Sequence, residues 1–270
     1  DKLSVCLLWL AAIVALASLL LVVGSIFAHG VGSITWEFLT DTPKLMGKEG
    51  GIWPSIVSTV YLVILSLLFA APVGVGAAIY FCEYAKNKAT TRYLQFATEI
   101  LAGVPSILFG LFGFSFFVNF LGLGWSLLSG SLTLALMILP TIQRTAEEAL
   151  TSVPSSLREG SLALGATRWQ TILRIVLPSA LPGIITGLIL AVGRSIGETA
   201  AVLLTAGSSL ATPNSLFSPA RSLSVHLFIL ATEGISQGRA YGTAVLLIVL
   251  VFLINTLANQ LRRRLSRRAA

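Results

Sequence analysis

The chain has 270 residues, of which 55% are hydrophobic and only 11% charged, and its mean hydropathy is +0.89. An average soluble domain carries about 25% charged residues, so this composition excludes a water-soluble globular fold and indicates an integral membrane protein. The formal net charge is +7, and no polar block long enough to fold alone interrupts the apolar runs, which predicts one domain over residues 1–270.

Six apolar runs are candidates for spanning helices. A span needs roughly 20 apolar residues, and it must be helical because lipid offers the backbone no hydrogen-bond partner. We expect all-α spans over about residues 3–27, 56–81, 94–121, 127–142, 181–204 and 240–261. The first run exceeds the short apolar core of a signal peptide, so we interpret it as a span. Residues inside the runs predict kinks, at Pro72, Pro105 and Gly110, and close helix packing, at Gly183, Gly187 and Gly193.

The positions of the basic residues predict which side of the membrane each segment faces. Lys and Arg accumulate in short cytoplasmic segments. With the N-terminus inside, the outside segments hold only Lys44, Lys48, Arg221 and Arg239. We therefore expect both termini in the cytoplasm. The basic end of the chain, residues 262–268, would lie against anionic lipid, and because it lacks interleaved aromatic residues we expect no nucleic-acid binding.

The inside loop over residues 144–178 has the pattern of two short helices joined by a turn. Ser155 or Ser156 is placed to cap the first helix with Glu159 nearby, and Gly165 permits a tight turn. Pro178 marks where the next span can start. The loop also carries apolar residues that need a partner surface, namely Leu162, Leu164, Trp169, Ile172 and Leu173. The alternative is an amphipathic helix resting on the membrane.

The fifth run contains two charged residues. Burying one charge in mid-membrane costs about 2.5 to 3.5 kcal/mol on insertion scales, so such charges are candidates for a functional site. Arg194 and Glu198 are four residues apart and would share a helix face. We predict that Arg194, whose fork geometry suits oxyanions, lines an anion path and that Glu198 prevents permanent trapping of the anion. A structural ion pair between them is the alternative.

Three other features leave two interpretations each. Glu99, at the start of the third run, is predicted to be a helix N-terminal charge rather than a path residue. Pro105 and Ser106 mark a kink that either lines the path or only packs. The apolar stretch over residues 222–233 is too short to span easily, so it is an interfacial or a re-entrant helix.

Signatures of an enzyme are scarce. The two histidines, His29 and His226, lie in outside segments away from acidic clusters and are interpreted as ordinary loop or interface residues, and the two cysteines, Cys6 and Cys82, as inert thiols. A glycine-rich phosphate loop is absent, since Lys48 is followed by Glu49. We therefore expect no metal, no cofactor and no ATP hydrolysis in this chain, so uphill transport would need a partner or an ion gradient.

The loop around Glu159 resembles the E-A-A-x(3)-G-x(9)-I-x-L-P loop of ABC-importer permease subunits. It departs from that pattern at Gly160 and Ser161, where the family has two alanines, and it matches at Glu159, Gly165, Ile175, Leu177 and Pro178. The resemblance implies a type I importer permease fold with its core at about residues 55–260. It also implies a cytoplasmic coupling helix that docks on an ATP-binding subunit through Glu159, Gly160, Ser161, Ala163, Gly165 and Ala166.

Residues 193–199, Gly-Arg-x-x-Gly-Glu-Thr, together with residues 99–107, resemble the permeases of the bacterial high-affinity phosphate importer, the A-type subunit in particular. This resemblance implies a phosphate path lined by Arg194, Ser195, Glu198, Thr199 and Ser106. It implies a second homologous permease, an ATPase dimer that holds ATP and Mg²⁺, and a periplasmic or lipid-anchored phosphate-binding protein, all at the bacterial cytoplasmic membrane. Sulfate, molybdate or phosphonate remain alternative substrates, and an ATP-independent channel or secondary transporter is the alternative from another class.

Overall fold

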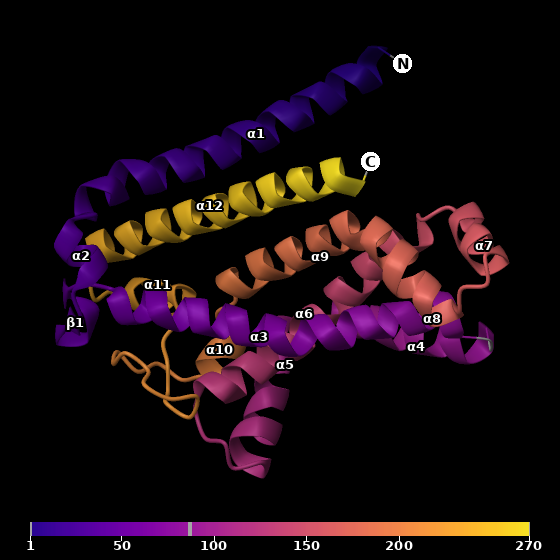
Figure 1. The fold of residues 1–270 in the computed structure, drawn as a ribbon. Helices are drawn as coiled ribbons and strands as arrows, with labels where there is room; N and C mark the ends of the chain where they lie inside the picture. Colours follow the sequence, from indigo (N-terminus) through magenta and orange to yellow (C-terminus); the bar gives the residue numbers. More distant parts are fainter. Residues whose placement is uncertain (1, 86–87, 270) are drawn as a thin grey trace.

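Long helices make up most of the computed structural model, which describes residues 2–85 and 88–269 (Figure 1). Five of them are long and apolar enough to cross a membrane, and a bent pair supplies a sixth candidate span. The α-helices are α1 (Lys2–Gly30), α2 (Trp36–Thr40), α3 (Trp53–Ile79), α4 (Lys88–Gly103), α5 (Ser106–Gly113), α6 (Leu127–Thr151), α7 (Ser155–Ala163), α8 (Arg168–Thr171), α9 (Leu177–Gly197), α10 (Ala200–Thr205), α11 (Leu223–Thr232) and α12 (Gln237–Ala269).

Short segments complete the chain. Two residues each form β1 (Pro43–Lys44) and β2 (Glu49–Gly50), an antiparallel pair with Pro43 opposite Gly50. The 3₁₀ turns are Val31–Ser33 and Leu45–Gly47, and π-helical segments extend three of the helices, at Tyr80–Tyr84, Phe114–Phe120 and Ile172–Val176. The N-terminus, the end of α12 and the pair α7 and α8 lie at one end of the molecule, and α2, β1 and α11 lie at the other (Figure 1).

The core lies between α3, α6 and α9. Leu134, Met137 and Ile138 of α6 are fully buried, as is Ala78 at the end of α3. Close approach of α9 to α6 depends on small residues, because a Cβ at Gly187 would collide with the hydroxyl of Thr145 and one at Gly183 with Ala149. The prediction of close packing is therefore confirmed for these two glycines, whereas a Cβ at Gly193 would meet open space.

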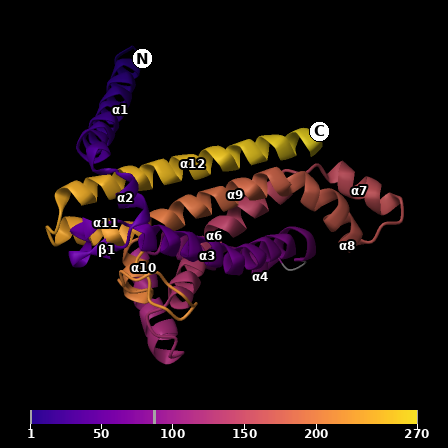
Figure 2. The same ribbon diagram turned by 60° about the vertical axis from the view of Figure 1, so that its left-hand side comes forward.

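Helix α1 lies outside this core. Its apolar window has no buried residue, and it projects away from the other spans in Figure 2. The C-terminal end of α1 packs on α12. There a Cβ at Gly30 would collide with Tyr241 and Val245, and the rings of His29 and Tyr241 stack with their centroids 5.2 Å apart. The surface of α1 is thus available to lipid or to another chain.

Two predicted spans are interrupted. The third bends by 100° between α4 and the segment from Ser106 to Phe120, where Pro105 has φ −57° and ψ 139°. Proline disfavours a helical conformation in the residue before it, and it has no backbone N–H to donate to a helical hydrogen bond. The helix therefore stops there. The fifth ends at Gly197 and resumes as α10, so the prediction of one continuous helix was wrong.

Other boundaries also differ from prediction. Helical structure already begins at Arg168 and passes through a π-helical segment into α9, so Pro178 does not start the span. Pro178 comes just after the π-helical segment Ile172–Val176, where the regular α-helical hydrogen-bond pattern is already interrupted. Helix α6 continues to Thr151, well past the predicted end at residue 142. The stretch over 222–233 is helix α11, apolar but shorter than a span. The side chains of the basic C-terminal tail, residues 262–268, lie outside the part of the chain that the structure describes.

Candidate functional site

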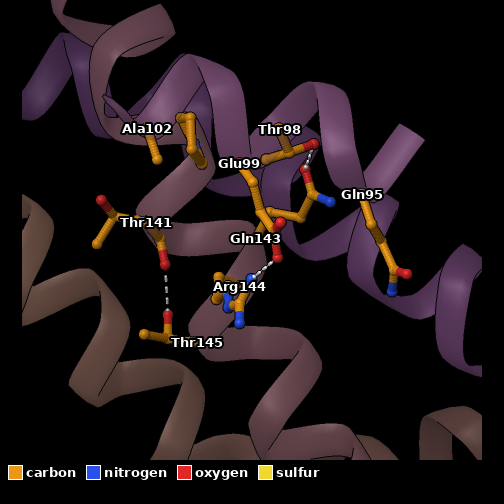
Figure 3. Close-up of a pocket in the computed structure, with 9 residues that line it drawn as sticks. Gln95, Thr98, Glu99, Ala102, Thr141, Gln143, Arg144 and Thr145 are labelled. Atoms are coloured by element: carbon orange, nitrogen blue, oxygen red, sulfur yellow. Dashed lines mark hydrogen bonds and ion pairs between the residues drawn. The ribbon is translucent and has the colours of Figure 1, made fainter. Parts of the chain in front are cut away.

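A cavity of about 350 Å³ lies between α4 and α6 (Figure 3). Arg144 of α6 forms an ion pair with Glu99 of α4, and its Nε also lies 3.7 Å from the carboxylate of Glu148. Around the pair the lining is mostly amide and hydroxyl side chains, contributed by Gln95, Thr98, Thr141, Gln143 and Thr145. Arg144 and Glu99 remain 59% and 56% exposed, so in this chain alone both can reach water or a solute.

The position of Glu99 corrects one prediction. Helix α4 begins at Lys88, so Glu99 lies near its C-terminal end and is not an N-terminal charge that the helix dipole would favour. Its partner is Arg144, which sequence reasoning had assigned to a cytoplasmic loop. The only sequence signal for this pairing was the position of Gln143 and Arg144 directly after an apolar run. Hydropathy could not show that helix α6 continues through them.

Arg194 and Glu198 do not form the predicted helical pair. Arg194 lies in the last turn of α9, but Glu198 is in an extended conformation (φ −73°, ψ 126°) after the helix has ended. The Ala201 N–H donates to Glu198 Oε1 at 3.2 Å, and the Ser224 hydroxyl donates to the Glu198 carbonyl at 2.6 Å. The Glu198 carboxylate therefore satisfies an N–H in the first turn of α10, whose N-cap residue is Thr199, and the Glu198 carbonyl ties the break to α11.

Arg194 itself has no hydrogen bond or ion pair with any residue that the structure describes. It follows Gly187 by seven residues, almost two turns, so it lies on the face of α9 that packs against α6. That part of α6 carries Thr141 and Thr145, which also line the cavity. Arg194 is therefore on the side of α9 that faces α6, almost two turns beyond Gly187, and it is not among the residues that line the cavity.

The remaining predicted path residues are distributed around this break. Ser195 is buried and its hydroxyl has no partner among the described residues, whereas Thr199 is half-buried and donates only weakly, at 3.5 Å, to the Gly197 carbonyl. Ser106 is half-buried at the start of α5. Helix α5 packs tightly on α10, since a Cβ at Gly110 would meet Ala201 and Leu204 at about 3 Å. The structure thus brings the Ser106 helix to the break beyond Arg194.

The predicted helix–turn–helix is present as α7 and α8. Gly165 has φ +86°, and the Ala166 N–H donates to Ser161 O while the Gly165 N–H donates to Leu162 O, which is a Schellman cap. Thr167 and Gln170 form a capping box at α8, and the Ser161 and Thr171 hydroxyls share a buried hydrogen bond of 2.9 Å. The prediction of a Ser155 or Ser156 cap was wrong, because Pro154 precedes the helix and makes no side-chain cap.

One arginine fastens this pair to the spans. Arg158 of α7 donates through Nε to Glu83 at the end of the α3 span, at 3.0 Å. Its other nitrogens donate to the carbonyls of Val153 and Leu150 at the end of α6. Displacement of α7 therefore acts on α3 and α6 together.

The surface of α7 and α8 exposes several large apolar side chains. Leu164 is 91% exposed at the tip, and Leu157, Leu162 and Trp169 are each about half-exposed. Of the predicted coupling residues, Ser161 is buried and Ala166 half-buried, and four are exposed, namely Glu159, Gly160, Ala163 and Gly165. Exposed apolar residues on a rigid tip indicate a protein-binding surface.

Comparison with known proteins agrees with these features. Residues 70–270 match the family model "Binding-protein-dependent transport system inner membrane component". The chain is 37% identical to the Bacillus subtilis protein named "Probable ABC transporter permease protein YqgI", over 92% of this chain and 90% of that protein. It is 35% identical to the phosphate transport system permease protein PstA of Mycobacterium leprae, over 87% of this chain and 80% of that protein.

Solved structures show the same fold. A bacterial alginate ABC transporter in complex with an alginate pentasaccharide-bound periplasmic protein has a chain that matches with a TM-score of 0.71 at 17% identity, covering 95% of this chain and 94% of that one. A chain of the MetNI methionine ABC transporter, in an inward-facing conformation, matches with a TM-score of 0.62 at 23% identity, covering 80% and 94%. The bent span, the broken span and the α7–α8 tip therefore occur on a type I importer permease fold. The chain belongs to the family of binding-protein-dependent transport system inner membrane components and is a membrane-spanning permease subunit of an ABC importer.

Proposed function

We propose that this permease conducts inorganic phosphate, along a path that passes Arg194 and then the Glu99–Arg144 cavity. The observation that carries the proposal is Arg194, a guanidinium in a membrane-spanning helix that has no counter-ion among the described residues. An arginine so placed offers paired N–H donors to a tetrahedral oxyanion. The relatives named as phosphate transport system permeases support this choice of anion.

The proposed path has two anion-binding sites of different character. At the break between α9 and α10, Arg194, Thr199 and Ser106 supply one cation and two hydroxyls, and the hydroxyl of Ser195 lies buried beside them. Closer to α7 and α8, Arg144 is already held by Glu99 and Glu148. An anion arriving there must compete with two carboxylates for Arg144, so the second site releases the anion easily.

Energy would enter through α7 and α8. We propose that this pair, with Leu164 at its tip, docks on a separate ATP-binding subunit, which holds ATP and Mg²⁺ and performs the hydrolysis. A second homologous permease would complete the path, and a phosphate-binding protein would deliver the anion at the end bearing α2 and α11. In this orientation both termini and the α7–α8 tip face the cytoplasm.

The test is phosphate uptake into vesicles that contain the co-expressed importer. Arg194→Gln is expected to lower uptake at least about tenfold, because a hydrogen bond to a charged group is worth about 1.5 to 3 kcal/mol. Arg92→Gln, which removes an exposed arginine from α4, is the matched control. Membrane levels and ATPase association must be equal. Normal uptake by Arg194→Gln would remove Arg194 from the path.

Competition by other anions tests the substrate separately. Sulfate, molybdate and phosphonate present similar oxygens to one arginine, so geometry alone does not separate them. In the same vesicles, excess phosphate is expected to suppress uptake of labelled phosphate while equal sulfate or molybdate leaves it unchanged. Suppression by one of those anions at lower concentration would reassign the substrate without affecting the permease assignment.

A further inference from the structure

A second cavity, of about 330 Å³, lies where α1 and α12 meet, at the end of the molecule opposite α7 and α8. It is lined by Gly32, Ser33 and Thr35 after α1 and by Ser236, Gly238 and Arg239 at the start of α12. None of these residues belongs to the proposed anion path. The lining contains a cation and three hydroxyls and no carboxylate, so it offers hydrogen-bond donors to a negatively charged group.

The ends of two candidate spans place the cavity near the membrane surface. The first candidate span ends at Ser33 and the last begins at Gln237, so two apolar segments stop directly beside it. The boundary of an apolar span marks the edge of the hydrocarbon layer, where phosphate groups of the lipids lie. In Figure 2, α1 diverges from α12 away from this end, and the apolar window of α1 has no buried residue, so lipid can reach the surface of α1.

Arg239 is fixed in position but not neutralised. Its guanidinium carbon lies 4.9 Å from the ring centroid of Phe38, whose side chain is only 1% exposed. No hydrogen bond or ion pair from this guanidinium reaches another of the described residues. Stacking on an immobile ring reduces the rotamer entropy that binding would otherwise remove, and it leaves the N–H donors available.

The hydroxyl groups are also oriented for donation. Thr35 Oγ1 accepts the N–H of Phe38 at 3.1 Å, and Ser236 Oγ accepts the N–H of Arg239 at 3.4 Å. Each oxygen is thus positioned by an accepted bond while its own proton remains available. Together with Ser33, these groups match the several acceptor oxygens of a phosphate group.

We propose that this cavity binds a phosphate group, and that the group belongs to the headgroup of a membrane phospholipid. Free inorganic phosphate presents the same chemistry and is the alternative source. The proposal does not depend on the identity of the transported substrate. Its consequence is that a lipid headgroup joins the ends of α1 and α12.

The experiment uses native mass spectrometry of the co-expressed importer, delipidated and then supplied with phosphatidylglycerol. Arg239→Gln is expected to reduce retention of the most tightly held lipid about tenfold, because a charge-assisted hydrogen bond is lost. Gly238→Leu is expected to do the same by filling the cavity, since a Cβ there makes only an ordinary 3.4 Å contact with Ser33 Oγ. Lys48→Gln, which removes an exposed charge at the same end, is expected to retain the lipid.

A second arm separates the two sources of phosphate. Equilibrium dialysis with labelled inorganic phosphate is expected to show no binding that depends on Arg239. Such binding, with lipid retention unchanged by Arg239→Gln and Gly238→Leu, would overturn the lipid assignment in favour of free phosphate. If neither lipid retention nor phosphate binding in dialysis changes in the two variants, the site itself is overturned. If Arg239→Gln fails to reach the membrane, Gly238→Leu decides the result, because it keeps the charge.

Discussion

Arginine side chains in the membrane-spanning region are held in two different ways. Arg144 has two carboxylate neighbours, whereas Arg194 has no partner within the described part of the chain. In the proposed path the two sites would differ in affinity, because a cation without a carboxylate neighbour retains an anion more strongly. Glu99 and Arg144 are 45 positions apart in the sequence, which explains why sequence reasoning did not find their pairing.

Exchanging the charges of this pair distinguishes a role in transport from a role in folding. Both side chains are more than half-exposed, so the pair contributes little to stability. We expect Arg144→Gln to lower phosphate uptake roughly tenfold, by loss of charged hydrogen bonds, with unchanged membrane levels. The double variant Glu99→Arg with Arg144→Glu restores an ion pair but moves the cation. Recovered uptake in that variant would assign the pair a structural role.

His226 shows how far a histidine can differ from its predicted environment. It was interpreted as a loop or interface residue, but its side chain is fully buried in α11, beneath Gly47, and neither ring nitrogen has a partner among the described residues. Burial, assisted by the positive charge of Arg221, lowers the pKa of His226 to about 4. Burial also lowers the pKa of Arg221, against the opposing influence of Glu233.

This pKa shift predicts a specific pH dependence of stability. Between pH 6.5 and about 4 the unfolded chain binds a proton at His226 that the folded chain does not, so the free energy of unfolding falls as pH falls. The total loss from this group is about 3 kcal/mol, at 1.36 kcal/mol per pKa unit. Thermal unfolding in detergent from pH 7 to pH 4 should show a steeper decline for the wild type than for His226→Leu. His29→Leu, at an exposed position, should keep the wild-type slope, and equal slopes for all three would contradict the shift.

At the scale of elements, the α7–α8 tip provides the most direct test of coupling. Leu164 is 91% exposed and makes the turn apolar. We expect Leu164→Ser to reduce co-purification of the ATP-binding subunit severalfold, because about 2 kcal/mol of apolar burial is lost at the interface, with no loss of folded permease. Leu216→Ser, which changes a half-exposed leucine at the opposite end, should retain the subunit. Equal retention by both variants would place docking elsewhere.

The sequence predicted where the apolar helices lie better than how they are shaped. Hydropathy located α1, α3, α6 and α12 because spanning a membrane requires long apolar runs. It missed the 100° bend at Pro105 and the break at Glu198, since apolar composition continues through both. The proline predicted a kink at residue 105 but not its angle. The charged pair was interpreted as one face of a continuous helix, so the break at Glu198 was not predicted, and there Glu198 is held by contacts with α10 and α11. The α7–α8 turn was predicted because Gly165 is a local signal.

At the scale of the whole molecule, the orientation in the membrane is the main remaining prediction. Single cysteines at Lys48 and Leu164, in a chain with Cys6→Ser and Cys82→Ser, lie at opposite ends. We expect an impermeant thiol reagent to label Lys48→Cys in intact cells and Leu164→Cys only after permeabilisation, because basic segments stay inside. The reverse pattern would invert the molecule and remove α7 and α8 from the cytoplasm.

The place of α1 also has a consequence for biosynthesis. Helix α1 packs its Gly30 end on Tyr241 and Val245 of α12, which is synthesised much later than α1. Until translation reaches α12, α1 stays in the bilayer without this neighbour. A ribosome that stalls before residue 241 would therefore leave an inserted chain in which α1 lacks its contact with α12, a defect that quality-control proteases can recognise.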